Sequence, residues 1–510
     1  MMFEKEYLQG LRSRFVFRCE SCKEEESVFT EAPPSRKKDK NAPQADDRET
    51  KNLNREMVLG AINAGLTHAQ IEELFCTLGL HIPASAVFSK YEREICEKTE
   101  KLLAEYLLQN GKAEREAALR AGEGFDHEGL VQTNVIVDGS WCTRSYGTRY
   151  RALSGCGVVI GYYSKKLLHI GVRNKFCAMC FRYRNSEKPH HKCFFYWDGP
   201  STGMEADIIV EAFRLAPTMH KLKYKRFIAD GDSNLYNELI AKVPYGRMIE
   251  KVECVNHACK CLTSRLYNKR KTGGQECSKR LTPIMIKKLS GYARATIIRI
   301  SQEGKGAKEL IEALNAIPHH FFSGDHTKCP GLCKDSGSKV PLTDCPSMIF
   351  LCHVLQAFET LTRRARLLIG NNTSNLAEYF MSIVAKLIGG KQFLVTQNGR
   401  YNSRVAAAGV KYSKGELGRL HIYRKITGRI PPRATTKLSM RKSRLRALKK
   451  RARKSMTCRN EILKQKKVNE PDGKYGPNAT TPDLAAVDFK IMKSAFLQRL
   501  ECSTEQIQEI

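Results

Sequence analysis

Two aspartates stand where predicted strands end, and carboxylates at such positions can bind metal ions. Asp138 follows the apolar run TNVIV, and Asp230 follows KYKRFIA. In an α/β sheet, ligands gather at the carboxyl ends of the strands, and neighbouring strands lie only about 4.8 Å apart. If the two strands are parallel neighbours, both carboxylates can share one divalent cation, and their hard oxygens suit Mg²⁺ or Mn²⁺. A third carboxylate from a helix would complete a two-metal site for phosphodiester chemistry.

The simpler interpretation of both aspartates is structural. Asp-Gly is common in turns, and Asp138 and Asp230 each precede a glycine. Asp232 competes with Asp230 for the second position and could equally be the neighbour of a helix cap. Asp230 is favoured because it directly follows the predicted strand.

A group of cysteines and histidines has the spacing of a zinc site. Cys177-x-x-Cys180 is followed by His191-x-Cys193, with His190 as the competitor of His191. Four soft ligands form a tetrahedral set that leaves no position for water, so the expected role is structural, pinning a loop close to the active edge of the sheet. The alternative is four unconnected residues.

Three other groups are weaker metal candidates. They are Cys254 with His257, to which Cys259 or Cys261 could add a ligand; His320 with His326, Cys329 and Cys333; and the half-site Cys19 with Cys22. A packed, hydrogen-bonded pair without metal explains Cys254 and His257 equally well. The start of the sequence shows no secretory signal, so the 19 cysteines argue for metal ligands rather than disulfides.

The charge balance favours a polyanionic partner. The chain has 86 Lys and Arg against 53 Asp and Glu, a formal net charge of +33 at pH 7. Nucleic acid is the usual partner of such a chain, although surplus lysine can also be a solvated surface. No run of eighteen apolar residues exists, so no membrane span is expected.

The densest positive charge lies in the segment RKSRLRALKKRARK, residues 441–454. It could be a solvated helix, a nuclear import signal or a phosphate-binding arm, and we expect both nuclear import and non-specific binding to DNA phosphates, without readout of bases. Self-repulsion should keep the segment extended in the absence of a polyanion. Its basic residues are Arg441, Lys442, Arg444, Arg446, Lys449, Lys450, Arg451, Arg453 and Lys454.

The elements that must position these residues follow from the apolar pattern. Residues 133–172 predict three consecutive strands, after which helices alternate with the strands KYKRFIA and MIEKVEC. This order predicts an α/β sandwich with a mixed sheet. Residues 57–120 have helical periodicity, and either a helix-turn-helix DNA reader or plain helix packing accounts for it. Residues 275–370 are also mostly helical.

Six segments together resemble the Mutator-like element transposases, in particular their animal branch, over roughly residues 57–430. They are VDGSW, CAMCFRYRNSEKPHHKC, WDGPSTGMEAD, IADGDSNLY, ECVNHACKCL and NNTSNLAEYF. The resemblance implies a ribonuclease-H-like catalytic domain with an Asp-Asp-Glu (DDE) triad that binds Mg²⁺ or Mn²⁺. By position, the triad is Asp138, Asp230 and Glu378. The Cys-x-x-His that follows the second acid in the family is Cys254 and His257 here, and residues 262–370 correspond to a helical insertion.

The resemblance, and not the helical pattern, selects Glu378. On a helical wheel Glu378 lies opposite the stripe formed by Leu376, Phe380, Ile383 and Leu387. Periodicity alone therefore predicts that its side chain is exposed to solvent.

The resulting fold is α/β, a ribonuclease-H-like mixed sheet flanked by helices, with a helical insertion, zinc-pinned loops and a basic tail. The expected segments are an N-terminal fragment and polar linker (1–56), a helical, helix-turn-helix-like part (57–128), the first part of the catalytic core (129–270), the insertion (271–370), the end of the core (371–415) and a partly disordered basic tail (416–510).

The expected function is DNA strand cleavage and strand transfer at element ends by a nuclear DDE transposase. Its partner would be DNA, with terminal inverted repeats as the recognised ends, and the protein could form a homo-oligomer on it. The alternative is a catalytically inactive, zinc-stabilised DNA-binding protein domesticated from a transposon. A ribonuclease-H-type nuclease acting on RNA is a third interpretation.

Overall fold

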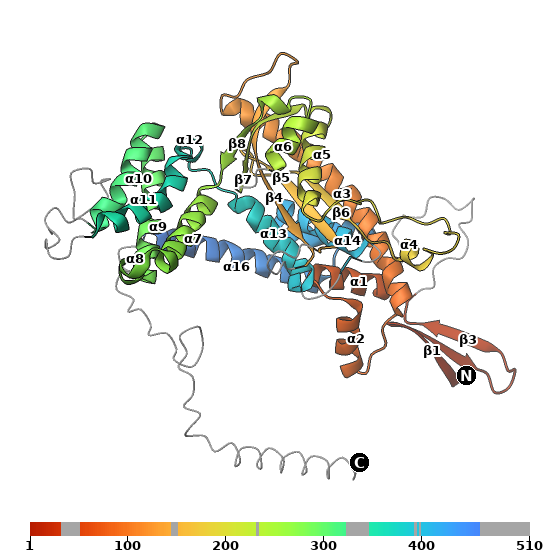
Figure 1. Cartoon of the computed structure of the whole chain (residues 1–510). Coiled ribbons are helices and arrows are strands. Elements are labelled where there is room, and N and C mark those ends of the chain that lie inside the picture. Colours follow the sequence, from red (N-terminus) through yellow and green to blue (C-terminus); the bar gives the residue numbers. More distant parts are fainter. Residues whose placement is uncertain are drawn as a thin grey trace, which may run out of the picture. The chain divides into compact units, whose positions relative to one another are not determined.

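The computed structural model describes residues 1–31, 51–143, 151–230, 234–322, 346–391, 395–396 and 399–458, with side chains as far as residue 452 in the last helix. The chain divides into two compact units, Met1–Met440 and Arg441–Ile510. The first unit contains every strand described below (Figure 1). None of the helices in these described ranges is both long and apolar enough to cross a membrane.

A five-stranded mixed sheet forms the centre of the first unit, in the order β6-β5-β4-β7-β8 (Figure 1). Its strands are β4 (Val131–Trp141), β5 (Ser154–Gly161), β6 (Leu167–Asn174), β7 (Leu222–Ala229) and β8 (Glu250–Glu253). β4, β5 and β6 are antiparallel, whereas β7 runs parallel to both β4 and β8. All eight residues of β5 are buried, as expected of a strand covered on both faces. The mixed sheet expected from the sequence is confirmed.

Helices cover both faces of this sheet. On one face, α5 (Gly203–His220) and α6 (Asn234–Lys242) share a core with β4 and β7. The opposite face shares a second core with helices that include α1 (Leu53–Ala64), α3 (Ser85–Arg120), α13 (Asn375–Leu387), α14 (Arg400–Lys414) and α15 (Gly418–Thr427). Because side chains alternate along a strand, Val135 and Val137 enter the first core and Ile136 enters the second.

A separate helical block, which we call the insertion block, has its own hydrophobic core. Its helices are α7 (Val255–Thr272), α8 (Gly274–Arg280), α9 (Pro283–Gln302), α10 (Ala307–Phe322), α11 (Met348–Thr362) and α12 (Ala365–Leu368). The block begins directly after β8 and ends shortly before α13. At this neck the Val255 N–H donates to the Asn372 carbonyl at 3.0 Å, so the chain enters and leaves the block side by side.

The N-terminal segment contains an antiparallel three-stranded sheet that the sequence pattern did not predict. Its strands are β1 (Met2–Gln9), β2 (Arg12–Arg18) and β3 (Glu25–Phe29). The short helices are α2 (His68–Thr77), α4 (Ala178–Arg182), η1 (Gly246–Met248), η3 (Gly389–Lys391) and η5 (Gly415–Leu417).

The basic segment is helical, and the expectation that it stays extended is wrong. Residues 441–454 lie within α16 (Arg433–Cys458), and the side chains of residues 441–452 are exposed. Arg, Lys, Leu and Ala are strong helix formers, and like charges one helical turn apart cost only about 0.2–0.5 kcal/mol per pair. The side chains of Arg453 and Lys454, and all residues from 459 onward, lie outside the described part of the chain.

Candidate active site and metal centre

Two of the predicted acids lie at the same edge of the central sheet. In the parallel pairing of β4 with β7, Ile136 is opposite Ile228. The same register continued by two residues brings Asp138 opposite Asp230. Asp230 directly follows β7, as predicted. The prediction that Asp138 follows its strand is wrong, because β4 continues to Trp141 through its pairing with β5. Because side chains alternate, both acids lie on the sheet face that Ile136 and Ile228 bury against α13. Asp232, the alternative second acid, lies outside the described residues.

The third predicted acid, Glu378, lies in the first turn of α13. Its Oε1 atom is 3.5 Å from His257 Nε2 and 4.0 Å from Lys260 Nζ, both on α7. The Glu378 side chain is 41% exposed, whereas Phe380, Ile383 and Leu387 of the apolar stripe are buried. The helical wheel therefore predicted correctly that Glu378 points away from the apolar stripe. On that side of α13, however, the side chain faces α7 and the other two acids.

The three carboxylates interact electrostatically. Burial, together with the negative charges of Asp230 and Glu378, raises the pKa of Asp138 to about 7. The Gly139 N–H, which donates to Asp138 Oδ1 at 2.9 Å, and the positive charge of Lys391 act in the opposite direction. Without a bound cation, the ionised form of Asp138 is therefore unfavourable, and a divalent ion would relieve the repulsion.

The acids are near one another without forming a closed cage. Among the described residues, the ligand oxygens of Asp138, Asp230 and Glu378 are not all within 4.8 Å of one another. Two ions roughly 4 Å apart can be bound by carboxylates that are too far from one another to share a single ion. The donor set itself, oxygen atoms only, suits Mg²⁺ or Mn²⁺.

Cys254 and His257 connect the insertion block to the helix that carries Glu378. The buried Cys254 sulfur accepts hydrogen bonds from the Ser374 N–H and hydroxyl, both at 3.3 Å. Ser374 is the N-cap position of α13, and His257 contacts Glu378 in the next turn. Within the described residues these two belong to no group of three or more metal ligands. The hydrogen-bonded interpretation therefore fits the structure.

Lys391 is a cation at this site that the sequence pattern did not reveal. Its Nζ donates to Ser140 Oγ at 3.0 Å, two residues beyond Asp138 on the same side of β4. Lys391 has φ +63° and follows Gly389 and Gly390, which also have positive φ. A non-glycine residue in this region is uncommon, and strained backbone often occurs at functional sites. The Gly-Gly dipeptide was the only local signal in the sequence.

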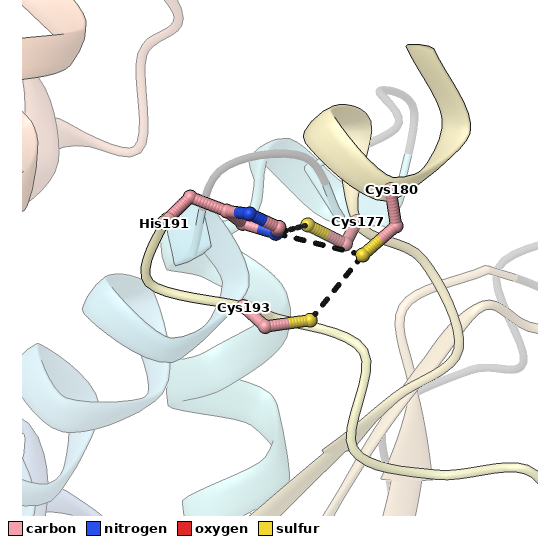
Figure 2. Close-up of side chains that lie close together, drawn as sticks. All are labelled: Cys177, Cys180, His191 and Cys193. Carbon is pink, nitrogen blue, oxygen red and sulfur yellow. Dashed lines mark hydrogen bonds between the residues drawn. The ribbon is translucent and has the colours of Figure 1, made fainter. Parts of the chain in front are cut away.

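Cys177, Cys180, His191 and Cys193 form a group that could hold a metal ion (Figure 2). Their ligand atoms all lie within 4.8 Å of one another. His191 Nε2 is 3.4 Å from the Cys177 sulfur and 3.5 Å from that of Cys180, which is itself 3.5 Å from the Cys193 sulfur. The group contains His191 and not its neighbour His190, which is exposed.

The surroundings of this group favour metal binding. His191 Nδ1 is 2.9 Å from the Pro189 carbonyl, which fixes the proton on Nδ1 and leaves the Nε2 lone pair directed at the sulfurs. Burial tends to raise the pKa of Cys177, but hydrogen bonds from backbone amides, chiefly that of Cys180, lower it to about 6. A thiolate is the form of cysteine that binds metal.

The remaining predicted ligands do not assemble in the described structure. His320 ends up on α10 among aromatic rings, 5.1 Å from Phe321 between centroids. His326, Cys329 and Cys333 lie outside the described residues. Cys19 and Cys22 lie at the turn between β2 and β3, where no third ligand joins them within the described part of the chain.

Comparison with known proteins defines the family. A family model described as Mutator-like transposase matches residues 1–333, and the chain therefore belongs to the Mutator-like transposase family. It is a transposase or a protein derived from one. No curated protein matches the chain. The matched region includes Asp138, Asp230 and the cysteine–histidine group, as well as the N-terminal sheet that the sequence resemblance had left out; Glu378 lies beyond it.

Proposed function

We propose that this chain is a DDE-type transposase with a ribonuclease-H-like core that cleaves DNA strands and joins 3′-hydroxyl ends to target DNA. The observation that carries the proposal is the parallel register of β4 and β7, in which Ile136 lies opposite Ile228. Continued by two residues, this register aligns Asp138 with Asp230. Glu378 approaches from α13, close enough for its charge to raise the pKa of Asp138. Three antiparallel strands followed by two parallel ones support the ribonuclease-H-like assignment.

Each residue of the site has a distinct role in this proposal. Asp138, Asp230 and Glu378 would hold Mg²⁺ or Mn²⁺, which when bound supplies Lewis acidity for the attacking and leaving oxygens. His257 restrains the Glu378 carboxylate, and Cys254 fixes the start of α13 through Ser374. Lys391 supplies a fixed positive charge beside Asp138, where the charge of a DNA phosphate needs compensation.

The proposal is tested with DNA from the flanks of the coding sequence. Purified full-length protein is incubated with a duplex that ends in an inverted repeat and a free 3′-hydroxyl, together with a supercoiled plasmid. With Mg²⁺ or Mn²⁺ we expect single-strand nicks at the repeat boundary and joined products. With Ca²⁺ we expect the protein to bind the DNA without cleaving it. Salt-dependent DNA binding without metal-dependent strand breakage would contradict the proposal.

That opposite outcome would identify a second candidate function, a zinc-stabilised DNA-binding protein that has lost catalysis. The observation in its favour is that the three carboxylates do not close to within 4.8 Å of one another. Competition between RNA–DNA hybrid and duplex DNA would detect a ribonuclease-H-type activity. In all three cases the exposed basic side chains of α16 support DNA contact and nuclear import, which expression of a fluorescent fusion with and without residues 441–454 would check.

Replacing His257 by alanine is expected to weaken metal use without removing a ligand. The His257 ring lies 3.5 Å from Glu378 Oε1, and loss of a group that orients a metal ligand typically costs about 10–100-fold in metal affinity or activity. The Mg²⁺ concentration that gives half-maximal cleavage should therefore rise at least roughly tenfold. His127→Ala, at an exposed position, is the control, and an equal change in both variants would argue against a role for His257.

A further inference from the structure

A groove separates the central sheet from the insertion block. Its volume is about 910 Å³. Asn134, Arg226 and Ile228 of the sheet lie on one side, and Arg363, Arg366 and Asn372, from the end of the insertion block, lie on the other. This volume is at the upper end of the range of ligand sites, roughly 300–1,000 Å³.

The sheet side of the groove leads to the acids. Along β4, Asn134, Ile136 and Asp138 point to the same face, and along β7 Arg226 and Ile228 do so in register with them. Each two-residue step advances roughly 6.6 Å. Asp230 therefore lies one step beyond Ile228 on β7, and Asp138 lies two steps, roughly 13 Å, beyond Asn134 on β4. A chain that occupies the groove can reach the acids without leaving the face of the sheet.

The opposite side leads to the third acid. Asn372 lines the groove, and its carbonyl forms the neck contact with Val255. Ser374 follows with its hydrogen bond to Cys254, and Glu378 lies in the first turn of the next helix. Both walls of the groove therefore end at members of the same acidic triad.

Positive charge predominates in the groove. Arg226, Lys251, Arg363 and Arg366 line it, against the single acid Glu250. Glu250 pairs with Arg226 at 2.6 Å, and Arg363 pairs with Glu359 at 2.6 Å. Arg366 is exposed and makes no hydrogen bond or ion pair with any residue that the structure describes. Its guanidinium is the one best placed to bind an added phosphate.

Aromatic side chains accompany these charges. Tyr162 and Tyr236 also line the groove, and Lys165 lies over the Tyr162 ring with its Nζ 4.0 Å from the centroid. A basic groove with interspersed aromatic rings is typical of sites for single-stranded nucleic acid, where cations follow the backbone and rings contact the bases.

We propose that this groove binds unpaired nucleotides of the DNA strand that leads to the cleaved phosphate. The inference rests on the proposed function, since it takes the acids as the reaction centre. It adds that the substrate is locally unpaired next to the cleavage site, with phosphates on the arginines of the insertion block and bases toward the sheet. The insertion block is then part of the substrate site and not only a structural addition.

The test compares Arg366→Glu with Arg214→Glu in the full-length protein. Arg214 is exposed on α5, on the opposite face of the sheet, so both variants change the net charge equally and α16 stays intact. Binding of a fluorescent single strand and of a blunt duplex is measured by anisotropy in EDTA over a range of salt concentrations. For Arg366→Glu we expect at least about tenfold weaker single-strand binding and a log–log salt slope shallower by about 0.7 per lost contact. Arg214→Glu should change the affinity less than about twofold.

The possible outcomes distinguish failure of the groove proposal from failure of the proposed catalytic function. Equal losses in the two variants, or no loss in either, would overturn the proposal. A loss of duplex binding as large as the loss of single-strand binding would mean that the groove holds paired DNA, and would overturn it as well. Because binding is measured without a catalytic metal, a wild-type protein that does not cleave can still show the Arg366 effect. An active enzyme without that effect would refute the groove alone.

Discussion

Asp138→Asn should abolish Mg²⁺-dependent strand cleavage and joining, with a loss of roughly a thousandfold or more, which corresponds to about 4 kcal/mol of activation free energy. The asparagine side chain has the same shape and can still accept the hydrogen bond of the Gly139 N–H through Oδ1. It removes the negative charge that a divalent ion needs at this position of β4. Glu378→Gln should give a comparable loss, because it removes the one acid that comes from a helix.

Stability measurements distinguish loss of catalysis from loss of folding. Burial, Asp230 and Glu378 all disfavour the charged form of Asp138, so its neutral replacement should leave the Tm of the metal-free protein unchanged or raise it. Glu116→Gln, an exposed change on α3, is the control for Glu378→Gln and should retain full activity. Full activity of Asp138→Asn, or a lowered Tm that accounts for the lost activity, would refute the assignment.

Cys180→Ser should release about one equivalent of zinc and destabilise the protein by several kcal/mol. The Cys180 sulfur lies 3.5 Å from both His191 Nε2 and the Cys193 sulfur. Its removal therefore takes away a ligand that lies between two of the others. Each kcal/mol of lost stability should lower Tm by roughly 2–4 °C in a domain of 150–250 residues. Metal content by mass spectrometry and thermal unfolding with and without chelator measure the two effects.

A neighbouring pair of histidines supplies the matched control. His191→Ala should reproduce the loss of zinc, whereas His190→Ala should bind zinc normally, because only His191 belongs to the group of ligands. Equal zinc content in wild type, His191→Ala and Cys180→Ser would rule out a structural zinc ion at this position.

The sequence predicted the central sheet well because its strands are nearly continuous apolar runs. β5, for example, is buried throughout, and a short apolar run that is bounded by turn residues is typical of a fully buried strand. β1 was missed for the opposite reason. All eight of its residues are exposed, so it has no buried face to impose alternation, and its pairing with β2 cannot be read from local pattern.

The candidate site was predictable in its residue types but not in its assembly. The apolar runs that lead into Asp138 and Asp230 are a local property of the sequence, whereas the alignment of the two acids depends on which strands pair and in what register. Lys391 reaches Ser140, which is 251 residues away in the chain, and no local periodicity encodes such a contact. Local periodicity also does not encode the contact between His257 and Glu378. These residues meet because the first and last residues of the insertion block lie next to each other.

The neck between Val255 and Asn372 has a consequence for the history of this protein. A backbone hydrogen bond joins the two ends of the insertion block. For the folding of the central sheet, the block is therefore equivalent to one closed loop between β8 and α13. Lengthening such a loop costs little free energy. Helices could therefore be gained, exchanged or enlarged there during evolution while the sheet continued to fold as before. The same construction makes this block the natural place for related proteins to diverge in size.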